Sequence, residues 1–572
     1  MTLRIVRRSQ PPQCVLSANL HPVLRRAYAA RGVTDSQALD NSLERMLPLG
    51  SLDGIEAAVE LLLAHRGRRV LVIGDFDADG ATSTAVILRA LRAWGFASAE
   101  FLVPNRFTYG YGLTPGIVAL AADRKPSLIV TVDNGVSSIE GVAAARALGI
   151  DVLVTDHHLP GAQLPAANVV LNPNLPGTGF ASRALAGVGV AFYLMAALRR
   201  ALVSRSLMAR TAPGATALLD LVALGTVADV VALDANNRVL VAQGLARIRA
   251  GRCAPGILAL LEVAERRRED STAADLAFCV APRLNAAGRI DDMSVGIACL
   301  LAERPDEARA LATQLDMLNR QRREIEAQMQ EEALAAVQRL RDPAAAITRH
   351  GVCLYDESWH QGVIGLVASR VKDLLRRPVI AFAKATDGTL RGSARSIPGV
   401  HIRDVLDAIA ARTPQLLSKF GGHAMAAGLT LERNQLDSFA REFDREAGAW
   451  LAAAQIHDGI ETDGELELAE IALETALAVR SGGPWGQAFP EPCFDGLFTV
   501  RSARVVGGKH LKLRVEVPQT GRSFDAIAFN SLDAHSFVEA PGSAARLVYR
   551  LGVNLYAGEE RLQLLIDHIL PP

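Results

Sequence analysis

Short, wholly apolar runs alternate with helical patterns between residues 69 and 172. Runs that are apolar at consecutive positions are typical of parallel strands buried on both faces of a sheet. The five runs are RRVLVIGD, AEFLVP, SLIVTVD, IDVLVTD and NVVLNPN. Segments such as ATSTAVILRALRAW and IEGVAAARALG lie between them and have helical spacing. The alternation predicts an α/β lobe with a doubly wound parallel sheet, which a mostly helical stretch over residues 181–300 completes.

The next stretch, residues 305–341, is rich in charge and carries one apolar stripe at helical spacing. The stripe consists of Leu311, Leu315, Leu318, Ile325 and Met329. A helix of this length would span roughly 55 Å at ~1.5 Å per residue. We expect it to pack along its stripe and to join the first lobe to a second, smaller α/β lobe. Strand candidates in that second lobe are GVCLYD and PVIAFAKA.

The segment from residue 453 to the C-terminus has a different period, because apolar and charged residues alternate one by one. In HLKLRVEV, Leu511, Leu513 and Val515 alternate with charged residues, which is typical of an antiparallel strand with one exposed face. Further strand candidates are RSFDAIAF, ARLVYRLGVN and RLQLLIDHIL. A small all-β module of this kind permits an OB-like barrel, although periodicity does not distinguish it from other small barrels.

Composition narrows the class of protein. A chain of 572 residues exceeds one hydrophobic core, and a prior of ~150 residues per domain predicts about three or four domains. Basic and acidic residues number 61 each, so contact with a polyanion requires a local basic patch. Six scattered cysteines without a C-x-x-C pair argue against a disulfide framework or zinc ribbon and favour a reducing cytoplasm. We expect neither a signal peptide nor a transmembrane span.

Residue types that bind metals follow three strands of the predicted sheet. They are Asp75, Asp77, Asp79, Asp133, Asp156, His157 and His158, and Asp229 follows a later apolar run. The ligand site of an open α/β sheet lies at the carboxyl ends of its strands, so these side chains should converge. Carboxylates with one or two imidazoles suit Mn²⁺ or Mg²⁺ and also accept Zn²⁺ or iron. Each motif alone would fit a capped turn or a pair of surface imidazoles, but their coincidence at successive strand ends favours a metal site. Several carboxylates can hold two divalent ions ~3.5–4 Å apart, an arrangement that hydrolyses phosphate esters.

The motifs GDFDADG, VDNG, TDHH and VAD resemble the four motifs of the DHH phosphoesterase superfamily. With VGVAFYL, APRLNAAGRIDDMS, WHQGVIGLVASR, GSARSIPGVHIRDVL and KFGGHAMAAGL, the chain is similar to the RecJ family of single-strand-specific 5′→3′ DNA exonucleases. This resemblance implies an α/β fold with a doubly wound parallel-sheet lobe and a C-terminal OB-like β-barrel. The implied domains are an N-terminal segment (1–65), a DHH catalytic domain (66–300), a long connecting helix (301–345), a DHHA1 substrate-binding domain (346–452) and an OB-like DNA-binding domain (453–572).

The resemblance also implies roles for the residues of the strand ends. The implied metal ligands are Asp77, Asp79, Asp133, His157 and Asp229. Asp133 would bridge two ions, His158 would face the substrate phosphate, and Asp75 and Asp156 would support them. In pyrophosphatase members of the superfamily a histidine precedes the first ligand by four residues, whereas Ile73 stands there in this chain. RecJ proteins share this departure, which predicts a first metal site poorer in ligands.

The second lobe should supply contacts to the substrate backbone. Residues 384–423 contain six Lys or Arg and three Asp, a local positive excess. Arg391, Ser393 and Arg395 can donate hydrogen bonds to phosphate. In Gly421, Gly422 and His423 the backbone N–H groups can approach an anion. That loop alone would fit a tight turn equally well, and the resemblance makes it a substrate-binding motif.

Further candidate substrate contacts lie in the first lobe and in the barrel. Arg106 could bind phosphate, and Tyr109 and Tyr111 could stack on unpaired bases, although ordinary turn packing explains either tyrosine as well. The resemblance also implies that Arg283 and Arg289 line the cleft that binds the substrate. Lys509, Lys512 and Arg514 of the barrel would extend the path for single-stranded DNA or, alternatively, form a docking surface for a partner.

The resemblance predicts an exonuclease that releases 5′-mononucleotides by two-metal-ion phosphodiester hydrolysis in DNA recombination and repair, with Mn²⁺ or Mg²⁺ as cofactor. A cleft too narrow for a duplex would select single strands. A DHH phosphodiesterase of short oligonucleotides or cyclic dinucleotides would be shorter, and a non-catalytic DNA-binding scaffold would have lost ligands. The partners implied are single-stranded DNA, a RecQ-type helicase and a single-strand-binding protein, and we expect a cytoplasmic monomer.

Overall fold

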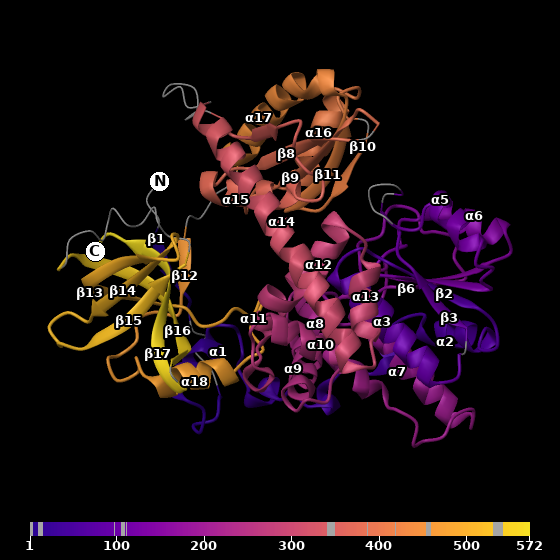
Figure 1. Cartoon of the computed structure of the whole chain (residues 1–572), viewed down its shortest axis with the longest axis horizontal. Helices are drawn as coiled ribbons and strands as arrows, with labels where there is room; N and C mark the ends of the chain where they lie inside the picture. Colours follow the sequence, from indigo (N-terminus) through magenta and orange to yellow (C-terminus); the bar gives the residue numbers. More distant parts are fainter. Residues whose placement is uncertain are drawn as a thin grey trace. The chain divides into compact units, whose positions relative to one another are not determined.

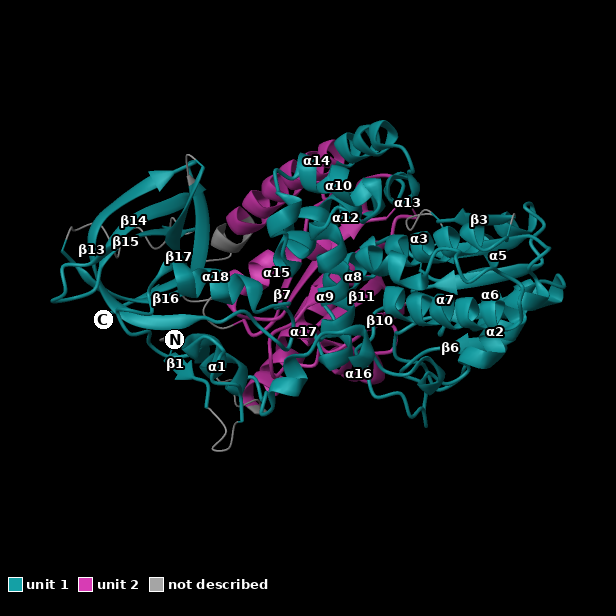
Figure 2. Ribbon diagram, turned by 90° about the horizontal axis from the view of Figure 1, so that it is seen from below, with its two compact units in different colours: residues 1–288, 292–315, 459–572 teal, residues 289–291, 316–458 magenta. Residues whose placement is uncertain are grey.

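The structure is a computed structural model, and it divides into two compact units (Figure 2). Unit 1 comprises residues 1–288, 292–315 and 459–572, and unit 2 comprises residues 289–291 and 316–458. The residues described are 4–9, 15–96, 98–104, 109, 111–339, 349–385, 387–417, 419–453, 459–529, 542–556 and 558–572, and the side chains of 336–339, 453 and 556 are not described.

The N-terminal α/β lobe of unit 1 contains a five-stranded parallel sheet, as the apolar runs predict. The strands are β2 (Val70–Gly74), β3 (Ala99–Leu102), β4 (Leu128–Val132), β5 (Asp151–Thr155) and β6 (Val169–Leu171). Their order is β3-β2-β4-β5-β6, and every neighbouring pair is parallel. All residues of β2 and β4 are buried, which explains why these strands lack a polar face.

Helices cover both faces of this sheet (Figure 1). On one face, α5 (Pro115–Ala122) and α6 (Ile139–Ala147) enclose a core with β2, β4 and β5. On the other face lie α3 (Ala78–Ala93) and α7 (Gly187–Ser204), which also pack against α8 (Leu219–Ala228). Helix α7 is long and apolar enough to span a membrane, but most of its residues are buried inside the lobe, where it serves as a core helix.

More helices follow and end in the predicted connecting helix. They are α9 (Ala235–Arg249), α10 (Pro255–Val263), α11 (Ala273–Asp275), a π-helical turn (Leu276–Val280), α12 (Ala281–Ile290), α13 (Ser294–Leu301) and α14 (Pro305–Arg339). Helix α14 has 35 residues, so the prediction of one long helix is confirmed. Of its apolar stripe, Leu315 and Met329 are buried.

Unit 2 is built on a second five-stranded sheet with the order β10-β11-β9-β8-β7. The strands are β7 (Val352–Tyr355), β8 (Val379–Lys384), β9 (Leu390–Arg395), β10 (Lys419–Gly422) and β11 (Ala426–Leu431). Only β7 and β8 run parallel, and the other pairs are antiparallel. Helix α15 (Ile364–Leu375) and α14 cover one face over β7 and β8. Helices α16 (Ile402–Arg412) and α17 (Leu436–Ala453) cover the other face.

The C-terminal region of unit 1 is a closed barrel with the strand order β13-β14-β15-β17-β16, which confirms the predicted OB-like barrel. The strands are β13 (Phe494–Val506), β14 (His510–Glu516), β15 (Ser523–Ala528), β16 (Ala544–Tyr556) and β17 (Glu559–Leu570). Alternate residues of β14 are buried, as the period of two predicts. Strand β13 was not among the predicted strands, because its long exposed portion lacks a regular alternation.

The N-terminal segment contacts both the barrel region and the α/β lobe of unit 1. Strand β1 (Arg4–Arg7) pairs in parallel with β12 (Gly459–Thr462), which leads towards the barrel. Helix α1 (Pro22–Ala29) contacts α18 (Leu473–Ser481). On the lobe side, the Tyr193 hydroxyl donates a hydrogen bond to the Leu47 carbonyl. Sequence reasoning assigned no role to residues 1–65, because the contacts with β12 and α18 join positions more than 400 residues apart.

Candidate metal centre

The predicted ligands converge at the carboxyl end of the sheet. Asp75 follows β2, Asp133 follows β4, and the Asp156–His158 loop follows β5. Asp77 caps the N-terminus of α3 by accepting the Gly80 N–H. Three sets of side chains each bring their ligand atoms within 4.8 Å of one another: Asp133 with His157 and His158, Asp79 with His157 and Asp229, and Asp75 with Asp77 and Asp133. The five metal ligands implied by the resemblance therefore lie in one cluster.

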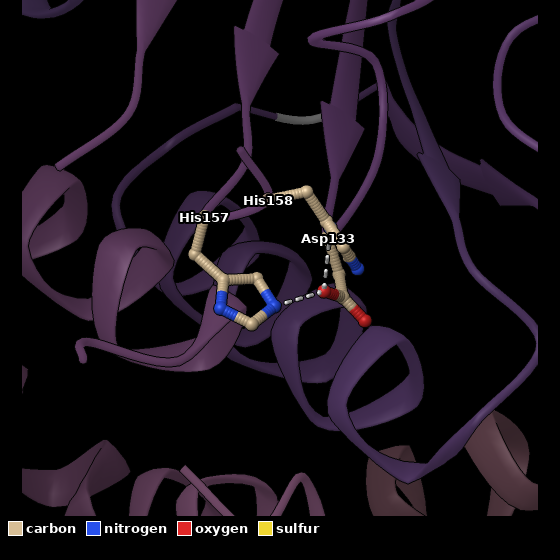
Figure 3. Close-up of side chains that lie close together, drawn as sticks. All are labelled: Asp133, His157 and His158. Carbon is tan, nitrogen blue, oxygen red and sulfur yellow. Dashed lines mark ion pairs between the residues drawn. The ribbon is translucent and has the colours of Figure 1, made fainter. Parts of the chain in front are cut away.

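His157 lies at the centre of this cluster, and Figure 3 shows it beside Asp133 and His158. Its Nε2 atom is 3.1 Å from Asp133 Oδ1 and 3.5 Å from Asp229 Oδ2. The same atom is 3.9 Å from Asp79 Oδ2, and His158 Nδ1 is 4.0 Å from Asp133 Oδ1. One imidazole nitrogen thus shares a small volume with three carboxylates.

The carboxylates of the cluster are held close together in a buried place. Burial and the neighbouring charge of Asp77 raise the pKa of Asp79 to about 7. Burial and the neighbouring charges of Asp79 and Asp77 raise the pKa of Asp133 well above its usual range, and the same causes raise the pKa of Asp229. Asp133 Oδ1 is buried and accepts no hydrogen bond from the described part of the chain. Such a set of hard oxygen ligands with uncompensated repulsion fits divalent cations such as Mn²⁺ and Mg²⁺.

Asp79 is oriented by the N-terminus of α7. Its two carboxylate oxygens accept hydrogen bonds from the backbone N–H groups of Gly187 and Val188, at 2.7 and 2.9 Å. A Cβ atom on Gly187 would lie 2.8 Å from Asp133 Cβ and 3.0 Å from Asp79 Oδ2, so only glycine fits beside the two carboxylates. The motif VGVAFYL contains a glycine of the same turn, but sequence reasoning did not identify the role of Gly187, because the strand ends and α7 meet only in the folded chain.

Asp156 orients the second imidazole, that of His158. Its Oδ1 atom lies 2.7 Å from His158 Nδ1 and accepts the His157 N–H at 2.7 Å, and its Oδ2 atom accepts the Val136 N–H. Burial acts to raise the pKa of Asp156, but these bonds and the His158 charge lower it overall. Burial acts to lower the pKa of His158, and Asp156 with Asp75 raises it overall. These contacts give a physical reason for the supporting role of Asp156, which stays a prediction.

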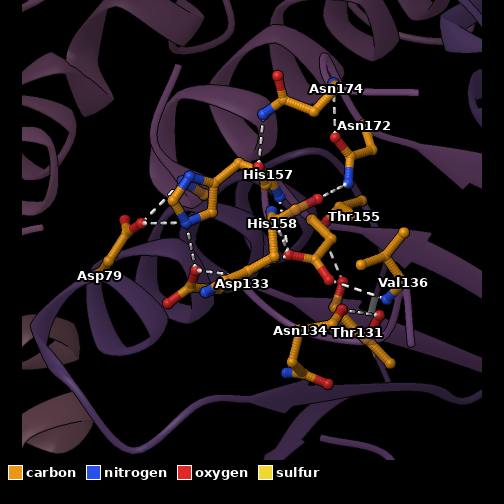
Figure 4. A network of polar contacts seen from close by, with 12 residues as sticks. Asp79, Thr131, Asp133, Asn134, Val136, Thr155, His157, His158, Asn172 and Asn174 are labelled. Atoms are coloured by element: carbon orange, nitrogen blue, oxygen red, sulfur yellow. Dashed lines mark hydrogen bonds and ion pairs between the residues drawn. The ribbon is translucent and has the colours of Figure 1, made fainter. Parts of the chain in front are cut away.

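Asparagine side chains that sequence reasoning missed hold the loops of the centre in place. Asn172 Nδ2 donates to the His158 carbonyl at 2.9 Å, and Asn174 Nδ2 donates to the His157 carbonyl at 2.6 Å (Figure 4). Asn285 Oδ1, on α12, accepts the Ala78 N–H at 2.8 Å. The amides satisfy backbone groups that the turns leave open. A cue existed in NVVLNPN and PRLNAAGR, where asparagines follow a strand and lie within a helix.

The backbone has an uncommon conformation at Asp133 and directly after Asp229. Asp133 has φ 61°, and Val230, which follows Asp229 directly, has φ 61°. Positive φ is costly for a β-branched residue and is found where the surrounding structure enforces it. The positive φ of Asp133 and of Val230 is therefore enforced by the structure around the cluster.

The predicted substrate contacts of unit 1 differ in their surroundings. The Tyr111 hydroxyl donates to the Asp133 carbonyl at 3.2 Å, and its ring lies edge-on to His158, so Tyr111 borders the centre. Tyr109 is half-buried and packs on the α5–α6 core. Arg283 is 8% exposed and donates to the carbonyls of Cys279 and Val263, which is a structural use of its guanidinium. Arg106 lies outside the described residues.

In unit 2 the predicted substrate residues share one open sheet face. Arg391, Ser393 and Arg395 are exposed or half-buried and alternate with buried residues of β9. In register beside them on β11 lie Thr430, Gly428 and Ala426. Lys419 and Gly421 of β10 continue the same rows. The two glycines leave the middle row without side-chain bulk.

We call this surface of β9, β10 and β11, with Arg391, Ser393 and Arg395 on it, the open sheet face. Further predicted substrate residues and the start of α15 lie close to its strands. A Cβ atom on Gly365, in the first turn of α15, would lie 2.8 Å from the Arg395 guanidinium and 2.9 Å from Ser393 Oγ. The N-terminus of α15 therefore points to the same place as these donors, and helix N-termini favour anions. Gly422 has φ 148° and His423 is exposed. Arg289 donates to the Gly362 carbonyl at 3.4 Å.

A doubly wound lobe with this cluster at its strand ends, followed by a second α/β lobe and an OB barrel, defines a metal-dependent phosphoesterase of the DHH class. Three family models match the chain: the DHH family N-terminal domain over residues 69–226, the DHHA1 domain over 346–449 and the RecJ OB domain over 462–568. These spans fall within the predicted domains, whose exact boundaries stay predictions.

Individual relatives extend over the whole chain. The chain is 50% identical to the single-stranded-DNA-specific exonuclease RecJ of Escherichia coli, over 100% of this chain and 99% of that protein. It resembles the crystal structure of Thermus thermophilus RecJ in complex with Mn²⁺, with TM-score 0.79, 28% identity, and coverage of 100% of this chain and 80% of that one. The Mg²⁺ complex of the same protein gives TM-score 0.74, 26% identity, and coverage of 100% and 78%. The chain belongs to the RecJ family.

Proposed function

We propose that the protein is a single-stranded-DNA-specific exonuclease that hydrolyses phosphodiester bonds from the 5′ end and releases 5′-mononucleotides. The observation that carries this proposal is the cluster of Asp77, Asp79, Asp133, His157 and Asp229 at the strand ends. It lies in a chain half identical, over its full length, to single-stranded-DNA-specific exonucleases. Such an enzyme acts in DNA recombination and repair.

The five residues of the cluster would hold two divalent cations, Mn²⁺ or Mg²⁺. Asp133 has ligand atoms in two of the three sets, which supports a bridging position between the ions. When bound, the cations lower the pKa of a water molecule and neutralise charge on the phosphate. His158 would donate a hydrogen bond from Nε2 to the phosphate, because its Nδ1 is held by Asp156. Asp75 would support the neighbouring ligands.

The open sheet face of unit 2 would bind the DNA backbone. The guanidinium groups of Arg391 and Arg395 can each donate two hydrogen bonds to a phosphate, and Ser393 adds a hydroxyl. The DNA backbone would pass over Gly421, Gly422 and His423, where the glycines add no side-chain bulk and backbone N–H groups can donate to phosphate. Arg289 would contact the substrate as the resemblance implies, whereas Arg283 would act by holding the helix that carries Asn285.

Further contacts and partners complete the proposal. Tyr111 would stack on a base near the centre, and Lys509, Lys512 and Arg514 would extend the path for the strand across the barrel. Arg514 already pairs with Asp525 at 3.0 Å. The protein would act as a cytoplasmic monomer beside a RecQ-type helicase and a single-strand-binding protein. Selection of single strands by a passage too narrow for a duplex stays a prediction.

The deciding experiment follows single-stranded DNA labelled at the 5′ or the 3′ end, across titrations of Mn²⁺ and Mg²⁺. We expect early release of a mononucleotide from the 5′ label and none in the Asp133→Ala variant. Early release from the 3′ label would reverse the polarity, and digestion of blunt duplex DNA would remove the strand specificity. Release only from cyclic dinucleotides or very short oligonucleotides would favour a phosphodiesterase, and no release with either metal would favour a scaffold.

A further inference from the structure

A cavity of about 100 Å³ lies in unit 1, away from the metal centre, and two arginines line it. Arg249 is the last residue of α9, and Arg480 lies in the last turn of α18. Thr272, Ser481 and Trp485 also line this Arg249–Arg480 cavity. Its volume exceeds the ~30 Å³ share of one water molecule several times, so a phosphate group fits. The cavity therefore has the size and the donor groups of an anion site.

Among the residues that line the cavity, the two arginines and Glu491 leave an excess of one positive charge. Arg249 donates through Nε to the Ser271 carbonyl at 2.9 Å, and Arg480 donates through both terminal nitrogens to Glu560 at 3.1 Å. Glu491 lines the cavity but accepts a hydrogen bond from Arg550 at 3.0 Å. The acids that face Arg249 are Asp270 and Asp275. Two guanidinium groups repel each other across the cavity, and a bound anion would relieve that repulsion.

A continuous helical run links the cavity to the metal centre. The run comprises α11, the π-helical turn and α12 up to Gly288. At its first end, Thr272 lines the cavity. At its other end, Asn285 accepts the Ala78 N–H of the ligand loop, and a Cβ atom on Gly288 would lie 1.7 Å from the Phe76 carbonyl oxygen. The thirteen residue-to-residue steps from Thr272 to Asn285 span ~20 Å at ~1.5 Å per step.

An exposed aromatic residue lies between these two ends. Phe278 occupies the π-helical turn and is 75% exposed. π-helical turns within α-helices are frequent at functional sites. Unpaired bases stack on exposed aromatic rings without regard to sequence. A phosphate-sized basic cavity and a stacking surface therefore follow each other along one helical run that ends beside the metal centre.

We infer that the Arg249–Arg480 cavity binds a backbone phosphate of the single-stranded DNA substrate and that Phe278 stacks on a base between this phosphate and the metal centre. The inference rests on the proposed function and adds a subsite to it. At ~3.4 Å per phosphate of a stacked strand, ~20 Å corresponds to about six nucleotides. A tetranucleotide would be too short to reach the cavity, whereas a twenty-nucleotide strand would occupy it.

The test compares hydrolysis of a tetranucleotide with that of a twenty-nucleotide strand, both single-stranded and 5′-phosphorylated, in the full-length protein with Mn²⁺. In the Arg249→Ala/Arg480→Ala double variant, we expect KM for the long strand to rise about tenfold more than KM for the tetranucleotide. The slope of log KM against log salt concentration for the long strand should fall by about 0.7 for each arginine removed. Phe278→Ala should raise KM for the long strand about threefold, and Phe278→Trp should restore it.

Controls separate this inference from the proposed function. Arg205→Ala removes an exposed arginine that pairs with Glu60 and should leave both substrates unaffected. If the double variant unfolds, the single variants Arg249→Lys and Arg480→Gln replace it. Each should again raise KM more for the long strand than for the tetranucleotide, by a smaller factor. An equal change in KM for both lengths, or no change, would overturn the inference. Loss of binding to a poly-aspartate peptide with unchanged KM would assign the cavity to an acidic protein segment instead. No hydrolysis by the unmodified protein would contradict the proposed function.

Discussion

The metal centre of unit 1 and the open sheet face of unit 2 are both proposed to act on a phosphodiester substrate, but they are built in opposite ways. The centre gathers like charges in a buried place, so that Asp133 and Asp79 have raised pKa values. The open sheet face keeps Arg391 and Arg395 partly exposed on a strand beside glycines. In the centre the backbone N–H groups that reach Asp79 leave most of the carboxylate repulsion in place. On the open sheet face, Arg391 and Arg395 donate to uncharged groups of Thr430, Ser393 and Ala394.

The difference in burial between the two regions follows from what each would bind. Ions that activate water must be held by several ligands at fixed positions, which requires burial and rigid support. A strand that moves through the enzyme after each cleavage needs contacts that are charged, accessible and replaceable. The two regions should therefore respond differently to mutation, to metal ions and to salt.

The largest effect should follow from Asp133→Ala. Loss of this ligand should reduce kcat by about 10³-fold or more, because one carboxylate serves two of the three ligand sets. The melting temperature of the metal-free protein should not fall, since one of several repelling carboxylates is removed. Exonuclease assays and thermal unfolding with and without Mn²⁺ test this, and a large loss of stability in the metal-free variant would contradict our description of the centre.

Gly187→Ala should have the next largest effect. The added methyl group would collide with Asp133 and displace the carboxylates, so we expect kcat to fall by about 10²-fold and Mn²⁺ to bind more weakly. Gly179→Ala is the matched control, because a Cβ atom there meets no described atom within 4 Å. Titration calorimetry with Mn²⁺ and steady-state kinetics would measure both, and unchanged metal affinity would show that Gly187 does not shape the centre.

Substitutions on the open sheet face should act on binding rather than on chemistry. Arg391→Ala and Arg395→Ala should each raise KM about tenfold, with a small effect on kcat and a smaller salt dependence by about 0.7 per arginine. Thermal stability and the stabilisation by Mn²⁺ should remain as in the unmodified protein. Loss of the stabilisation by Mn²⁺ in these variants, as expected for Asp133→Ala, would contradict the contrast between the two regions.

The smallest effect concerns a buried carboxylate that, unlike those of the centre, has cationic partners. Asp495 accepts hydrogen bonds from Arg7, Arg546 and Thr462. Burial acts to raise its pKa, but these partners lower it overall. Its contribution to stability is therefore complete above the ordinary pKa of ~3.9 and is lost as pH falls through the lowered value.

Asp495→Asn should thus lower the free energy of unfolding at pH 7 by about 1–3 kcal/mol. The variant should also lose less stability than the unmodified protein between pH 5 and pH 3. Urea unfolding at a series of pH values measures this difference. Parallel curves for the two proteins would show that Asp495 does not carry the acid sensitivity, and Glu474→Gln, in the first turn of α18, is a control for loss of one acid.

Much of the fold could be predicted from local pattern, because burial on both faces leaves consecutive apolar residues in β2, β4 and β5. The connecting helix and the barrel were predictable from their periods in the same way. Strand β13 and the pairing of β1 with β12 were not, because their residues carry no regular alternation and their partners are far away in sequence. The candidate ligands were predictable because parallel strands bring their carboxyl ends together.

The sequence by itself determined which residue types follow the strands, and with them a site for hard divalent cations. Only the tertiary structure decided which of these groups share a small volume, that Gly187 must lack a side chain, and that Arg283 is engaged by backbone carbonyls. The physical reason is that periodicity is a local property set by the backbone. The charge state and availability of a side chain depend instead on neighbours that distant segments supply.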